Sequence, residues 1–363
     1  MIKILMNKDI PVLKFDFDDY YIEVLNNKYL PFMLKDYVKT TTPYDYKKTF
    51  KDIELIKDFL ISRTINISRT NAKQILISSN MPQSERVSDK LKIVFACRAL
   101  SMEDNYWLKE ENENIKWNNV NLRNQHLSDV SFIISIIGKQ ISATAKELTP
   151  DLMTKGSFPK CWFRKNDKVY MIKTDIMNDN INTKCELKVS KYLEDLGIYA
   201  IKYKSFIKNN RLFAVSECFA DDTQTIIDGF SVKDWCFHNN ISFINYIEQN
   251  FLEDFSNMCV LDYVFANTDR HLGNILFTVD DNNEIIRFGP LHDHNLALIA
   301  DYTNSDINEL IYDATGLSMI DTVKEYAKYS TVDFSNINLS NKCKERLEIV
   351  KQYYREDASL SRV

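Results

Sequence analysis

The sequence predicts an α+β protein, because short alternating strands and longer amphipathic helices occupy different stretches of the chain. Residues 12–17 and 20–24 alternate apolar and polar side chains around Asp18 and Asp19, which indicates two strands joined by a turn. Residues 50–65 instead repeat apolar side chains at helical spacing, for example at Ile53, Ile56 and Leu60. Strand-rich and helix-rich stretches follow one another along the rest of the chain.

The remainder of the first 140 residues is predicted to be mainly helical. Helices are expected at residues 68–79, with Ser68 as the N-cap, at 88–100 and from Ser128 to about 139, and a hairpin at 106–109 and 115–117. The pair of helices at 68–100 could be a DNA-binding helix-turn-helix. We interpret it as a packing unit instead, because residues 93–97 form an apolar run that must be buried.

The composition limits which classes of protein the chain can belong to. A chain of 363 residues with 45% hydrophobic and 12% aromatic residues is globular and long enough for two cores. A net charge of −5 gives no overall attraction to nucleic acid or to an anionic membrane. The 7 scattered cysteines contain no Cys-x-x-Cys pair, and no signal peptide or apolar run of membrane-spanning length is recognised. We therefore expect a cytoplasmic protein with reduced thiols and without a structural zinc site.

From residue 148 the pattern changes to short strands, expected at 161–164 and 168–174, followed by a helix at 184–196 between a Thr183 cap and Gly197. Lys173 projects from the otherwise apolar face of the second strand, and Glu186 lies near the start of the helix. We predict that Lys173 and Glu186 form a buried ion pair. The alternative is that they are two separate surface charges.

The rest of the chain is predicted to hold two further hairpins and several helices. The hairpins are expected at residues 199–207 with 212–218, and at 274–279 with 284–288. A long helix is expected at 241–267, and two or three helices at 305–357, including residues 307–313 and 344–350.

The residues most suggestive of chemistry follow the long helix. Asp269 and Asn274 stand five positions apart, as the catalytic Asp and metal-binding Asn do in kinase catalytic loops. The hairpin at 274–288 returns the chain towards Asn274, so Asp293 should fall close to the same point. One carboxylate could orient a hydroxyl while Asn and a second carboxylate hold Mg²⁺. The alternative is an ordinary surface loop rich in Asn and Asp.

Residues 267–274 (Asn-Thr-Asp-Arg-His-Leu-Gly-Asn) and 290–293 (Pro-Leu-His-Asp) resemble the catalytic segment of the HipA-like bacterial Ser/Thr kinases. The Asp-Arg-His-x-x-Asn string is also similar to that of phosphoinositide 3-kinase relatives. The resemblance spans about residues 145–300. It implies a two-lobed, protein-kinase-like fold with an accessory module at 1–144, a small nucleotide-binding lobe at 145–222 and a large catalytic lobe at 223–363.

The resemblance also implies roles for individual residues. Asp269 would be the catalytic base, with Asn274 and Asp293 as Mg²⁺ ligands and Lys173, fixed by Glu186, on the ATP phosphates. His271, grouped with the catalytic residues, would position the loop or Asp293, whereas the sequence leaves the role of Arg270 open. Further nucleotide contacts are expected in the phosphate loop and at the hinge between the lobes: Gly156, Ser157, Lys160, Glu217 and Phe219.

The phosphate loop departs from the usual kinase pattern, because Gly156 is its one glycine. Thr154 and Ser157 lie in this loop and are expected autophosphorylation sites. A phosphate on either residue would add negative charge beside bound ATP and weaken its binding.

The function predicted from these observations is ATP- and Mg²⁺-dependent phosphorylation of a Ser or Thr on a protein. The resemblance also implies a role as the toxin of a toxin–antitoxin pair with an antitoxin-like partner. The first alternative is a kinase of a small molecule or lipid. The second is a nucleotide-binding pseudokinase that binds a partner protein or DNA. Direct nucleic-acid or membrane binding is not expected.

Overall fold

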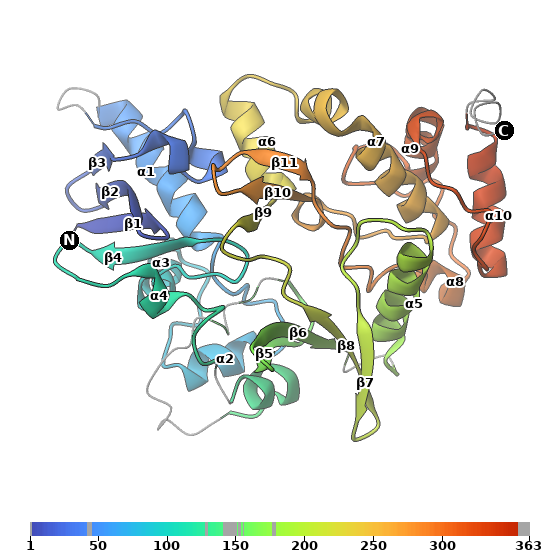
Figure 1. Ribbon diagram of the computed structural model, residues 1–363, viewed down its shortest axis with the longest axis horizontal. Helices are drawn as coiled ribbons and strands as arrows, with labels where there is room; N and C mark the ends of the chain where they lie inside the picture. The colour runs from blue at the N-terminus through green and yellow to red at the C-terminus, as the bar shows by residue number, and fades with distance from the viewer. Residues whose placement is uncertain are drawn as a thin grey trace. The chain divides into compact units, whose positions relative to one another are not determined.

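The computed structural model describes residues 2–41, 46–127, 130–140, 151, 154, 156–175 and 179–354, and it confirms the α+β class. The chain divides into two compact units, whose elements are labelled in Figure 1. The first unit contains Met1–Thr174, Glu217–Ile226 and Val279–Glu284. The second contains Asp175–Ser216, Ile227–Thr278 and Ile285–Val363. The division into functional domains at 144/145 and 222/223 stays a prediction.

A four-stranded antiparallel sheet forms the core of the first unit. Its strands follow the order β3 (Tyr21–Val24), β2 (Ile10–Asp16), β1 (Lys3–Asn7) and β4 (Tyr106–Glu110). The helices α1 (Tyr46–Ile61) and α3 (Val87–Ala96) pack together and share one buried cluster with the sheet (Figure 1). The predicted strands at 12–17 and 20–24 and the predicted helix at 50–65 are therefore present, with shifted ends.

The predicted hairpin at 106–117 is wrong. Its first strand is β4, which pairs with β1, the first strand of the chain. Residues 117–120 form a short helix, α4 (Trp117–Val120). The reason is burial: Trp107 is fully buried in β4, and its indole Nε1 donates to the Lys8 carbonyl at 2.7 Å. A local hairpin could not have supplied that long-range contact.

The remaining elements of the first unit include α2 (Ala72–Ser78), the π-helical turn η3 (Ile133–Ile137), and the strands β5 (Lys160–Lys165) and β6 (Lys168–Thr174). The N-cap of α2 is Asn71, not the predicted Ser68. The expected start of a helix at Ser128 lies outside the described residues. The strands β5 and β6 form the predicted antiparallel hairpin. Two short 3₁₀ turns, η1 (Asn27–Tyr29) and η2 (Phe32–Leu34), complete this unit.

The second unit is built around α7 (Phe243–Val264), which contacts α6 (Gly229–His238), α9 (Met319–Tyr326) and α10 (Asn341–Lys351) (Figure 1). The helix bends at Phe251, whose ring packs on Phe277 and Phe288. These two rings belong to β10 (Leu276–Asp280) and β11 (Ile285–Phe288), the predicted hairpin, which forms a sheet in the order β11-β10-β9 with β9 (Gln224–Asp228).

The second unit also contains α5 (Ile181–Asp195), the antiparallel strands β7 (Lys204–Lys208) and β8 (Arg211–Glu217), the short helix α8 (Ile299–Thr303) and the 3₁₀ turn η6 (Ala327–Tyr329). Two predictions here are wrong. The helix α5 is preceded by Asn180 and not by Thr183, and residues 307–313 form no helix. Those residues lead instead into an extended bridge between Ile311 and Ser318, and the buried Tyr312 hydroxyl bonds to Asp262, a long-range contact that helical spacing cannot reveal.

None of the helices in the described part of the chain has both the length and the apolar content needed to cross a lipid bilayer.

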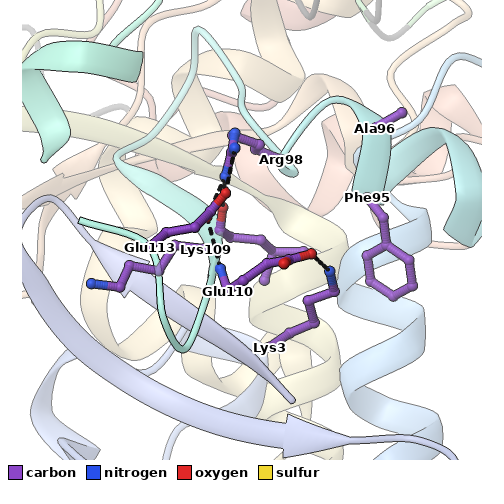
Figure 2. A pocket seen from close by; sticks show the side chains of 8 residues that line it. Lys3, Phe95, Ala96, Arg98, Lys109, Glu110 and Glu113 are labelled. Carbon is purple, nitrogen blue, oxygen red and sulfur yellow. Dashed lines mark hydrogen bonds and ion pairs between the residues drawn. The ribbon is translucent and has the colours of Figure 1, made fainter. Parts of the chain in front are cut away.

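Figure 2 shows a small pocket of the first unit, lined by charged residues of β1, β4 and the chain after α3. Arg98 donates to both carboxylate oxygens of Glu113 at 2.7 and 2.8 Å, and Lys3 donates to Glu110 at 2.6 Å. Because these lining charges pair with one another, we assign the pocket a structural role.

The Glu113 carboxylate should make stability depend on pH. Its hydrogen bonds with Arg98 lower its pKa from 4.5 to about 2, so its contribution is present above pH 4.5 and is lost as the pH falls towards 2. We expect Glu113→Gln to lower the free energy of unfolding by about 1 kcal/mol at pH 7 and by much less at pH 3. Urea denaturation at both pH values measures the difference, with Glu54→Gln, an exposed helical pair with Lys57, as the control. A pH-independent effect of Glu113→Gln would contradict this assignment.

Candidate functional site

The segment that carries Asp269 connects α7 to β10 within the second unit. It leaves the helix sharply: the amide of Asn267 donates to the carbonyl of Asp262 at 2.7 Å, and its side-chain Nδ2 donates to Oδ1 of Asp262 at 2.8 Å. The segment ends in the 3₁₀ turn η5 (Leu272–Asn274). Asn267 is fully buried, so the start of the loop is held by the last turns of α7.

The guanidinium of Arg270 is the centre of this segment. It is fully buried and faces the buried carboxylate of Asp262, with Nε–Oδ2 and Nη2–Oδ1 distances of 2.8 and 3.0 Å. Nη1 donates to the carbonyls of Asn274 and His292 at 2.8 and 2.9 Å, and Nη2 lies 3.1 Å from Nε2 of His294. Arg270 therefore connects both ends of the loop to the chain around Asp293.

Asp262 has a further partner outside the loop. The hydroxyl of Tyr312 donates to its Oδ2 at 2.5 Å, and one residue along α7 the hydroxyl of Tyr263 donates to Asn308 at 2.7 Å. Burial, followed by the Asp262 charge, raises the pKa of Tyr312 well above its ordinary value, so the phenol stays a donor. The chain near Tyr312 is therefore held by the same Asp262–Arg270 ion pair that holds the loop with Asp269.

Asp269 and Asn274 are brought together by the turn. The side-chain Nδ2 of Asn274 donates to the backbone carbonyl of Asp269 at 2.9 Å, and the amide of His271 donates to that same carbonyl at 2.9 Å. Asn274 is buried, whereas Asp269 is half-buried. The bond fixes the plane of the Asn274 amide, and its Oδ1 has no hydrogen-bond donor among the described residues.

His271 holds the turn between them. Its Nδ1 accepts from the amide of Gly273 at 3.0 Å, and its ring stacks on Phe230 of α6 at 6.4 Å between centroids. A Cβ on Gly273 would press against the His271 ring at 2.9 Å. These contacts agree with the positioning role expected for His271, while participation in the chemistry stays a prediction.

Asp293 reaches this region through the hairpin β10–β11. The hairpin closes with the amide of Gly289 donating to the carbonyl of Leu276 at 2.6 Å, where a Cβ would meet the Leu276 backbone at 2.6 Å. Only glycine allows this approach. Asp293 itself takes a left-handed conformation with φ of 56°. The preceding carbonyl, that of His292, accepts from Arg270 at 2.9 Å, and the Asp293 charge acts on both Asp269 and Arg270. Its role as a metal ligand stays a prediction.

The electrostatics favour a cation beside these groups. Burial raises the pKa of Asp269, and the charges of Asp293 and Asp313 raise it further, against the opposing effects of His271 and Arg270. Within the described ranges, no three His, Cys, Asp or Glu side chains gather closely enough to hold a metal alone. Mg²⁺ commonly takes one or two protein oxygens and completes its shell with phosphates and water. The free Oδ1 of Asn274 and the Asp293 carboxylate fit that donor set.

In the first unit, Lys160 and Lys173 lie directly opposite each other on the antiparallel pair β5–β6, so their side chains leave the same face. Both are buried, at 6% and 8% exposure. Their contact with a phosphate stays a prediction. Gly156 has a φ of 95°, and a Cβ there would collide with Lys160 Nζ. The carbonyl of Lys160 accepts from Arg69 Nη2 at 2.5 Å, which fixes this strand end.

The other predicted nucleotide contacts occupy different places. Glu186 is buried on α5 in the second unit, so its expected pairing with Lys173 of the first unit stays a prediction. Glu217 is exposed and forms an ion pair with Lys168 at 2.7 Å. Phe219 is half-buried and Ser157 is exposed. Their contacts with a nucleotide stay predictions.

Sequence reasoning missed Asp262 and Tyr312 and left Arg270 open. A signal for Asp262 was present, since one acid stands in the apolar run 258–266 of a buried helix and requires a buried partner. No comparable signal marked Tyr312, which lies 50 positions away from Asp262.

Removal of the Asp262 charge tests the importance of this ion pair. We expect Asp262→Asn to lower the free energy of unfolding by about 3–5 kcal/mol, because the Arg270 guanidinium stays buried without its counter-charge. The matched control is Asp195→Asn, which removes an exposed pair with Lys191 and should cost less than about 1 kcal/mol. Chemical denaturation of the two variants measures both values, and equal losses would contradict a central role for Arg270.

Comparisons with known proteins agree with this geometry. The profile of the family described as phosphatidylinositol 3- and 4-kinase matches residues 135–356, which is more than half of the chain. A search of curated proteins found no match.

Several solved structures are similar to this chain, among them two that have 88% of their own length covered. One is HipA of Shewanella oneidensis MR-1, from its toxin–antitoxin complex with HipB and operator DNA. It has 11% identity over 97% of this chain and 88% of that chain, with a TM-score of 0.57. The other is the Helicobacter pylori proinflammatory kinase CtkA, with 16% identity over 55% of this chain and 88% of that chain and a TM-score of 0.38. The HipA similarity shows a shared kinase-like fold, as predicted. The chain belongs to the phosphatidylinositol 3- and 4-kinase family and has a HipA-like kinase fold.

Proposed function

We propose that the protein transfers the γ-phosphoryl group of ATP to a Ser or Thr hydroxyl of a polypeptide in a Mg²⁺-dependent reaction. The observation that carries this proposal is the joint placement of Asp269 and Asn274 on one rigid turn, with the Asp293 charge nearby. Family membership supports phosphotransferase activity in general. The acceptor, the metal and the residue roles are the proposed part.

In this proposal Asp269 acts as the base. It orients the acceptor hydroxyl and takes its proton while the hydroxyl oxygen bonds to the γ-phosphorus, and the bond to the β–γ bridging oxygen breaks to release ADP. Its raised pKa suits a group that must accept a proton. Asn274 and Asp293 would hold Mg²⁺, which neutralises phosphate charge when bound.

The first unit would bind the nucleotide. Lys160 and Lys173 would contact the phosphates, because their buried ammonium groups share one face of the hairpin. The backbone at Gly156 and Ser157 would approach the phosphates, Glu217 and Phe219 would contact the adenine, and Glu186 would fix Lys173. ATP use is consistent with the family, and each of these contacts is proposed.

A lipid kinase is the second candidate, because the family is named for phosphatidylinositol kinases. The binding of HipB and operator DNA is a property of the solved HipA complex. A toxin role and an antitoxin-like partner therefore do not enter the proposal.

Substitution of the base tests the proposal. We expect Asp269→Asn to lower transfer of labelled phosphate to protein by about 10²–10⁴-fold, because the acceptor proton loses its base, while ATP affinity changes little. Labelled-ATP transfer and calorimetric ATP binding measure the two effects. Glu348→Gln, an exposed acid on α10, is the matched control. Transfer at the wild-type rate by Asp269→Asn would contradict the assignment.

Autophosphorylation in the phosphate loop should favour Ser157. The Ser157 side chain is exposed, whereas the Thr154 hydroxyl is half-buried and donates to the Asp151 carbonyl at 3.2 Å. We expect mass spectrometry after ATP incubation to find phosphate on Ser157, and Ser157→Ala to remove it while Thr154→Ala does not. Phosphorylated protein should bind ATP more weakly, because the added charge lies near Lys160. A loop that remains unmodified contradicts this expectation.

A further inference from the structure

An exposed patch centred on Ile311 lies in the segment that follows α8, where the sequence predicts a helix. Ile311 is 63% exposed, and Leu310 and Leu317 of the same segment are 44% and 37% exposed. The segment doubles back on itself: Tyr312 N donates to the Leu317 carbonyl and Met319 N to the Leu310 carbonyl, both at 2.8 Å. These side chains are therefore held at the surface by a closed turn and not by a flexible tail.

The patch is anchored to the proposed catalytic loop. Tyr312 points inward, and its hydroxyl bonds to Asp262, the carboxylate that also holds Arg270. In an extended segment neighbouring side chains alternate, so Ile311 and Asp313 point outward on either side of Tyr312. Asp313 directly follows the residue that bonds to Asp262, and its charge raises the pKa of Asp269.

The charges around the patch indicate which kind of acceptor molecule it binds. Asp306, Glu309 and Asp313 are exposed, and none of them has an ion pair within the described ranges. A phosphoinositide headgroup is polyanionic and would be repelled by these carboxylates. A polypeptide with a basic residue near its acceptor hydroxyl would instead be attracted, and an apolar residue could cover Ile311.

We propose that the surface formed by Glu309, Ile311 and Asp313 binds the acceptor of the reaction, a polypeptide with basic and large apolar residues beside its Ser or Thr. This inference rests on the proposed phosphotransferase function and adds the chemistry of the substrate. Asp313 and Glu309 attract the basic residue, and Ile311 packs against the apolar one. The surface thereby selects protein over lipid acceptors.

Synthetic acceptors test the inference with the full-length protein. The probes are a serine peptide with arginine and leucine flanks, the same peptide with glutamate in place of arginine, and phosphatidylinositol vesicles. We expect kcat/KM for the arginine peptide to exceed that for the glutamate peptide by about tenfold or more, because attraction is exchanged for repulsion. Labelling of the vesicles should be weaker than labelling of the arginine peptide.

Substitutions in this surface test whether it causes the preference for the arginine peptide. Asp313→Asn and Glu309→Gln should each reduce the preference for arginine by up to about fivefold, mainly through KM. Ile311→Ser should raise KM for the leucine-flanked peptide and leave KM for a peptide with serine in place of leucine nearly unchanged. Glu345→Gln and Phe237→Ser remove an exposed acid and an exposed apolar side chain elsewhere in the unit and are the controls.

The possible failures can be distinguished. Equal or reversed preference between the two peptides, or a preference unchanged by Asp313→Asn and Glu309→Gln, contradicts the binding surface alone. Phosphorylation of the vesicles with no phosphorylation of either peptide shows a lipid acceptor and contradicts the surface and the proposed protein acceptor together. No transfer to any acceptor and no ATP turnover contradicts the proposed function itself.

Discussion

The buried ion pair between Arg270 and Asp262 is the interaction on which the candidate site depends. Removal of both charges from water is costly, and the structure offsets that cost by giving each group several partners. Asp262 accepts from Arg270, Asn267 and Tyr312, and Arg270 also donates to the carbonyls of Asn274 and His292. One carboxylate thus connects the end of α7, the loop with Asp269, the chain before Asp293 and the exposed patch around Ile311. These segments are far apart in sequence, and the pair sets their relative placement.

The arrangement of charge within each unit has a chemical consequence. In the second unit, the raised pKa of Asp269 reflects first its burial and then the charges of Asp293 and Asp313. In the first unit, two buried lysines face each other on one hairpin. Carboxylates favour a nearby cation, and lysines favour a nearby anion. Magnesium-bound ATP contains both kinds of charge, which is consistent with the ATP use that the kinase family implies.

Local features were predictable from the sequence, and long-range ones were not. The hairpins β2–β3, β5–β6 and β10–β11 have alternating strands around short polar turns, and the spacing of Asp269 and Asn274 identified their loop. The pairing of β1 with β4 depends on Trp107, which meets its partner about 100 residues away in sequence. Residues 307–313 have helical spacing, but the segment is extended at Ile311 and Tyr312 bonds to Asp262 on another element. Arg270 could not be assigned for the same reason, since its acceptors lie on other segments.

Binding of ATP with and without Mg²⁺ tests the central claim most directly. Calorimetric titration can compare the wild-type protein with an Asn274→Ala, Asp293→Ala double variant, in Mg²⁺ and in EDTA. If these two residues hold the cation on the bound nucleotide, Mg²⁺ should strengthen ATP binding in the wild type, and the double variant should lose that increment while it retains the affinity measured in EDTA. An increment of the same size in both proteins would contradict a nucleotide–metal site built on the Asp269 loop.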